Sequence, residues 1–150
     1  MAKFHYSMEN ILNVKTKIEE QKKMELAKAM MAHKVEIKKQ EAIKAELDTT
    51  IEDFRERQKQ SHSVSEFKRL SHNVNYYEKA YKAQKEVVVK AKEKVEAKRK
   101  ALQNALEEKK IQEKLKEKAL DVFIEEEKYK EIKMLDEIVG FRYSTKTDEE

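Results

Sequence analysis

Apolar residues return every three or four positions through the first third of the chain, the spacing that places them on one face of an α-helix. A four-residue step from Lys22 to Leu26, where three was due, is a stutter that locally relaxes supercoiling. The spacing predicts a long helix over residues 4–58 as one half of a coiled coil. Its seam positions are Phe4, Met8, Ile11, Lys15, Ile18, Lys22, Leu26, Met30, His33, Ile37, Gln40, Lys44, Leu47, Ile51 and Phe54.

The pattern stops after Arg57, where a polar stretch rich in serine follows. Ser63 and Glu66 then stand three residues apart just before the next apolar run, which is the signature of a capping box at a helix N-terminus. We therefore expect the turn at residues 59–64.

The three-four spacing resumes after the turn and continues almost to the end of the chain. It predicts a second, longer helix over residues 65–139, with Gly140 as its C-cap and a frayed tail over residues 141–150. Its seam positions are Phe67, Leu70, Val74, Tyr77, Tyr81, Gln84, Val88, Ala91, Val95, Lys98, Leu102 and Ala105, then, after a slip near Glu107, Ile111, Leu115, Val122, Tyr129, Ile132 and Val139.

Composition agrees with two thinly packed helices. Charged residues make up 43% of the 150 residues and apolar ones 39%, too few for a thick core, and one Gly with no Pro leaves little material for turns. The sequence thus predicts an all-α fold in which two long helices form an antiparallel coiled-coil hairpin, a single domain over residues 1–150. With two matched seams in one chain, we expect a monomer.

Little in the sequence points to catalysis. The chain has no Cys, and its single glycine, Gly140, excludes the glycine-rich loops that bind nucleotide phosphates. Of its four histidines, His62 and His72 could approach each other near the turn, but two imidazoles without a carboxylate make a weak zinc site. We expect no enzyme activity, no cofactor and no metal.

Charge and hydropathy limit the partners and the location. The 34 basic and 30 acidic residues are mixed along the chain, and each basic run is flanked by glutamates, which disfavours nucleic-acid binding. No apolar run approaches the roughly 18 residues that span a bilayer, and the first residues lack the apolar core of a signal peptide. We expect a cytoplasmic protein.

An aromatic cluster near the start of the second helix divides into two roles. Tyr77 and Tyr81 fall on the seam, whereas Tyr76, one residue earlier, points away from it. An outward tyrosine is either an anchor for a partner or plain exposed surface, and the pattern alone favours neither.

Both ends of the chain resemble the FliJ family, the small coiled-coil protein of bacterial flagellar type III export. The opening Phe4-His5-Tyr6-Ser7-Met8-Glu9-Asn10-Ile11-Leu12-Asn13-Val14-Lys15 has that family's two aromatics, then Met-Glu and an apolar pair ahead of a basic residue. The segment Glu131-Ile132-Lys133-Met134-Leu135-Asp136-Glu137-Ile138 resembles its closing Leu-Asp-Glu segment.

The resemblance implies a non-enzymatic stalk, similar to the coiled coil of the rotary ATP synthase γ subunit. It would bind and stimulate the hexameric export ATPase, contact the membrane export gate, escort export chaperones and so serve motility and chemotaxis. The protein would then associate peripherally with the inner face of the cell membrane at the flagellar base. By position, the resemblance places Phe4, Met8, Ile11 and Glu137 at the ATPase end, and Phe67, Leu70, Tyr76 and Tyr77 at the gate end.

Composition alone supports a plainer alternative, a structural spacer with no export role. Two helices with many intrahelical charge pairs are compatible with both the export role and the spacer role.

Overall fold

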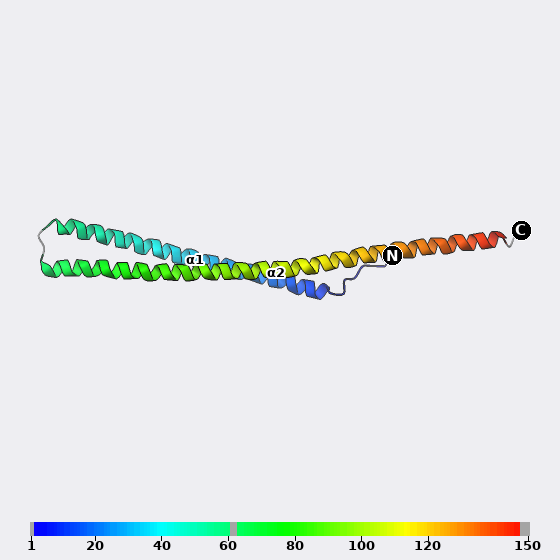
Figure 1. Ribbon diagram of the computed structural model, residues 1–150, viewed down its shortest axis with the longest axis horizontal. Helices are drawn as coiled ribbons and strands as arrows, with labels where there is room; N and C mark the ends of the chain where they lie inside the picture. The colour runs from blue at the N-terminus through cyan, green and yellow to red at the C-terminus, as the bar shows by residue number, and fades with distance from the viewer. Residues whose placement is uncertain (1, 61–62, 148–150) are drawn as a thin grey trace. The chain divides into compact units, whose positions relative to one another are not determined.

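The computed structural model describes residues 2–60 and 63–147, which form two helices and, within these ranges, no strand. Helix α1 spans Glu9–Gln58 and helix α2 spans Val64–Thr147 (Figure 1). They pack against each other as an antiparallel coiled-coil hairpin, so the predicted fold class is confirmed.

The helix ends differ from prediction at two places, the start of α1 and the end of α2. Helix α1 begins at Glu9 rather than near residue 4, because Tyr6 and Met8 offer their carbonyls to the first amides of the helix from a non-helical segment. The turn begins as expected after Gln58. Ser63 caps α2 with a 3.4 Å hydrogen bond from the amide of Glu66 to its Oγ. His62 lies outside the described residues.

Helix α2 does not stop at Gly140 but runs on to Thr147, so the expected frayed tail is helical over residues 141–147. Gly140 has no positive φ, which a left-handed C-cap would need. In the last turns, side-chain hydroxyl groups donate hydrogen bonds to backbone carbonyls. Thr145 donates to the carbonyl of Arg142, and Thr147 donates to those of Tyr143 and Ser144. Residues 148–150 lie outside the described part.

The chain divides into two compact units. Unit 1 combines the residues up to Glu19 with those from Ala105 onward, and unit 2 is Glu20–Asn104, which holds the turn. Whether the two behave as one domain stays a prediction.

Each unit has a thin core along its seam. Most seam side chains are half-buried, and only a few described apolar residues are buried, with Glu19 among them as a buried charge. These apolar residues are Tyr6, Leu12 and Ala105 in unit 1 and Leu47, Leu70 and Val95 in unit 2. Leu47, Leu70, Val95 and Ala105 lie on the predicted seam, whereas Tyr6 and Leu12 do not.

Candidate binding surfaces

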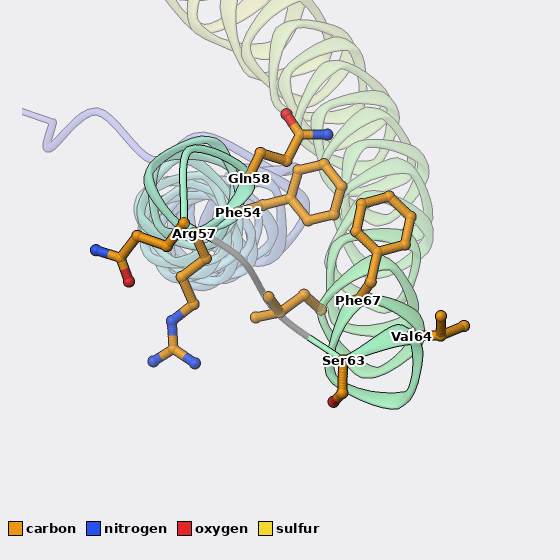
Figure 2. A pocket seen from close by; sticks show the side chains of 8 residues that line it. Phe54, Arg57, Gln58, Ser63, Val64 and Phe67 are labelled. Carbon is orange, nitrogen blue, oxygen red and sulfur yellow. The ribbon is translucent and has the colours of Figure 1, made fainter.

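The turn end of unit 2 carries an open hollow of about 620 Å³ between the two helix ends. In Figure 2, Phe54 of α1 and Phe67 of α2 face each other, with ring centroids 5.3 Å apart, and Val64 points away. The full lining is Phe54, Arg57, Gln58, Gln60, Ser63, Val64, Phe67 and Leu70. The hollow is aromatic on its walls and polar at its rim.

Two of the four residues predicted for the export gate lie at this hollow. Phe67 is 47% exposed, whereas Leu70 is only 6% exposed. Tyr76 and Tyr77 do not line it. They form a separate pair farther along α2, their rings 5.3 Å apart in an edge-to-face arrangement. Tyr76 is 64% exposed and Tyr77 is half-buried, as the seam pattern predicts.

The residues predicted for the ATPase end do not form one site. Phe4 packs on Phe123 of α2, with the ring centroids 5.4 Å apart. Met8 and Ile11, which follow Phe4 closely in the sequence, are both more than 40% exposed. Glu137 stands fourteen residues beyond Phe123, roughly 21 Å farther along the helix axis. It lines a second hollow, of about 410 Å³, with Met134, Ile138, Phe141, Arg142 and Thr145.

That second hollow belongs to a longer exposed segment, which we call the C-terminal segment, Lys128–Thr147. Every residue in it is exposed. Eight of them are large and apolar, and they are Tyr129, Ile132, Met134, Leu135, Ile138, Val139, Phe141 and Tyr143, between 48% and 75% exposed. Sequence reasoning missed this surface because it assigned Ile132 and Val139 to the seam and everything after Gly140 to a frayed tail.

Polar contacts across each seam join a residue of α1 to one of α2. In unit 1, Glu9 pairs with Lys116, Lys15 with Glu108, and Glu19 with Lys109 at 2.6 Å. Tyr6 also donates its hydroxyl to Gln112 Oε1 at 3.3 Å. These contacts fix which turns of the two helices face each other.

In unit 2 two carboxylates accept hydrogen bonds across the seam. Lys98 Nζ donates to Glu25 Oε2 at 3.1 Å, and this bond, helped by Lys22, holds the pKa of Glu25 below its ordinary value of 4.5. The Gln84 side-chain amide donates to Glu36 Oε2 at 2.7 Å and to the Glu36 carbonyl, and mainly for this reason the pKa of Glu36 is lowered too.

The described residues hold no group of three His, Cys, Asp or Glu side chains placed to bind a metal ion. Over the same ranges, neither helix has a stretch apolar and long enough to cross a bilayer.

The family model described as "Flagellar FliJ protein" matches residues 4–148. The chain belongs to the FliJ family. That family is a non-enzymatic component of export.

A solved structure gives the same fold for this FliJ-family chain. It is that of a YscO homologue, CT670, from Chlamydia trachomatis, with a TM-score of 0.82 and 17% sequence identity. The match covers 99% of this chain and 100% of the other. Among curated proteins the comparison finds no match.

Proposed function

We propose that this chain is a non-enzymatic component of the flagellar type III export apparatus that binds and stimulates the hexameric export ATPase. In this proposal it also contacts the membrane export gate, escorts export chaperones and works at the cytoplasmic face of the membrane. Family membership supports the export role. The observation that carries the ATPase role is the exposed C-terminal segment of α2.

The apolar residues of this segment do not lie on one face. At 100° per residue, Tyr129, Ile132, Val139 and Tyr143 fall on one side of α2. The other group, Met134, Ile138 and Phe141, falls on the opposite side, and Leu135 lies between the two groups. A helix that is apolar on opposite sides is normally buried all round, and one flat partner would leave one group in water. A ring that encloses the helix covers both, as a central channel of a hexamer does.

A spacer has no use for such a segment. Eight large exposed apolar side chains within fifteen residues favour aggregation unless a partner covers them. This observation favours a docking function over the spacer alternative.

The ATPase proposal is tested by charging one side of the segment. Ile138→Glu with Phe141→Glu should reduce stimulation of the purified export ATPase at least fivefold, because buried charges are costly in an apolar channel. Both positions are solvent-exposed, so circular dichroism should show unchanged melting. Val89→Glu, at an exposed apolar position of α2 in unit 2, is the control and should stimulate normally. Full stimulation by the double variant would remove the segment from the ATPase contact.

The gate contact is assigned to the hollow at the turn end. Phe67 is its exposed aromatic, and Arg57 and Gln58 at its rim can hydrogen-bond a peptide that inserts an apolar side chain. Phe67→Ala should weaken binding to the soluble domain of the gate protein about tenfold in a titration. Equal affinity would move the contact elsewhere, with Tyr76 as the next position to change.

A further inference from the structure

The side of α1 that faces away from α2 carries a second apolar stripe in unit 2. Met24, Met31 and Val35 are 63%, 64% and 48% exposed, and Ala27 lies between them in the same row. The spacing of seven and four residues keeps the row on one face. His33, nine residues from Met24 and thus half a turn round the helix, is half-buried in the seam, so the stripe lies opposite the seam.

Lysines border this stripe. Lys28 and Lys38 flank it at about 40° on either side, and Lys34 lies farther round. All three are exposed, and none forms an ion pair with another described residue. The two carboxylates of the same stretch, Glu25 and Glu36, are engaged in the seam with Lys98 and Gln84. The outward face is therefore apolar along its centre and positive along its edges.

We propose that this outward face of α1, from Met24 to Lys38, binds an acidic amphipathic helix of an export chaperone. Charge complementarity selects the partner, because an apolar stripe with carboxylates on its borders would pair its acids with Lys28, Lys34 and Lys38. Methionines suit the role since their flexible, polarisable side chains fit several apolar surfaces, as a carrier of more than one client requires. The same face of a second copy would bring lysine against lysine.

The inference rests on the proposed function for the identity of the partner. The ATPase is assigned to the C-terminal segment in unit 1 and the gate to the turn end of unit 2. The stripe on α1 is distinct from both, and the chaperones are the one class of proposed partner without a surface.

The apolar part is tested by titrating the full-length chain with each purified flagellar export chaperone from the same bacterium. Met24→Glu with Met31→Glu should weaken the binding of at least one chaperone tenfold or more. Met24→Gln with Met31→Gln, which keeps the charge and favours helix, should weaken it less but measurably. Val89→Glu is the control and should bind as the unchanged chain does, with helicity equal in all four.

The charged part is tested by a second set of variants in the same titration. Lys28→Glu with Lys34→Glu and Lys38→Glu should weaken binding and flatten or reverse its dependence on salt, because the attraction that salt screens is replaced by repulsion from the acidic helix. A matched triple on α2, Lys79→Glu with Lys92→Glu and Lys100→Glu, makes the same change in net charge at exposed positions. It should leave the affinity within twofold.

Each other outcome overturns the proposal. No chaperone binding to the unchanged chain, equal binding by the methionine variants, or equal loss from both lysine triples would each do so. A sedimentation mass of a dimer that Met31→Glu reduces to a monomer would assign the stripe to a second copy. Stimulation of the ATPase is measured on the same samples, so that intact stimulation with failed chaperone binding refutes this inference while sparing the proposed function.

Discussion

Polar residues, rather than large apolar ones, specify how α1 aligns with α2 within each unit. The described core has no large side chain that is fully buried, so apolar packing alone would tolerate a shift by one turn. A shift would separate Glu25 from Lys98 and Glu36 from Gln84 in unit 2. In unit 1 it would leave the buried carboxylate of Glu19 without its contact to Lys109, which is costly for a buried charge.

The two seam carboxylates of unit 2 predict an acid-sensitive interface. Their pKa values are lowered in the folded chain, so the stability they contribute is present above pH 4.5 and is lost as the pH falls through the lowered values. We expect the free energy of unfolding to drop as the pH falls below about 4.5, and to drop less in a variant with Glu25→Gln and Glu36→Gln.

Urea unfolding at a series of pH values measures this effect. Glu46→Gln with Glu52→Gln is the control, because both side chains are exposed and the change in net charge is the same. Equal acid sensitivity in the two double variants would mean that the seam carboxylates do not control it.

The neighbouring tyrosines Tyr76 and Tyr77 separate a seam role from a surface role. Tyr77→Ala should lower the free energy of unfolding by about 2 kcal/mol, less than for a fully buried ring because the side chain is only half-buried. Tyr76→Ala loses only its edge-to-face contact and should cost about 0.5 kcal/mol. Thermal and urea unfolding of both variants measure the difference, and equal costs would contradict the assigned register.

At the scale of the elements, spacing predicts the helices well and their ends less well. Two helices, a turn after Gln58 and a cap at Ser63 all follow from the sequence. The predicted start of α1 is too early because Phe4 has helical spacing to Met8 and Ile11 but packs on Phe123 of α2 from a non-helical segment. Periodicity records which side chains are apolar, and it does not show whether their backbone is helical.

The seam itself drifts away from a strict heptad pattern. Met30 and Lys44 were assigned to the seam, but both are exposed, and the half-buried residues are their neighbours Ala29 and Ile43. Positions seven residues apart on a straight α-helix drift about 20° around its axis relative to a perfect 3.5-residue repeat. A series of seam positions extended over many turns therefore rotates out of the interface. The sequence analysis assigned only one apolar stripe, the seam, to each helix. For this reason it did not identify the second stripe on α1 around Met31, which belongs to a candidate site.

Gly140 tests why α2 continues to Thr147. A Cβ there meets no atom within 4 Å, and the residue has helical backbone without positive φ. Gly140→Ala should therefore stabilise the last two turns by about 0.8 kcal/mol, through the lost flexibility of glycine. Hydrogen exchange of the amides of residues 141–147 should slow about three- to fourfold. Gly140→Pro should speed exchange, and faster exchange in the alanine variant would instead indicate a cap at this residue.

At the scale of the whole molecule, the seam residues of α1 pack on those of α2 within one chain. The remaining apolar surfaces lie outside the seams. The C-terminal segment and the outward face of α1 differ in character. The first is apolar on opposite sides, and the second is apolar with a positive border. This difference supports the assignment of different partners to the two surfaces.

The oligomeric state decides whether those surfaces are open to other proteins. We expect sedimentation equilibrium at micromolar concentrations to give the monomer mass of 17.9 kDa, because each helix already has its seam partner and the lysine-bordered face of α1 repels its own copy. The C-terminal segment is where self-association would begin, since its eight exposed apolar residues have no charge of one sign around them. The experiment is therefore run on the unchanged chain and on the variant with Ile138→Glu and Phe141→Glu. Equal monomer masses leave the segment free for the ATPase ring. A dimer mass that the double variant reduces to a monomer would show that a second copy covers the segment, and the ATPase would then have to displace it.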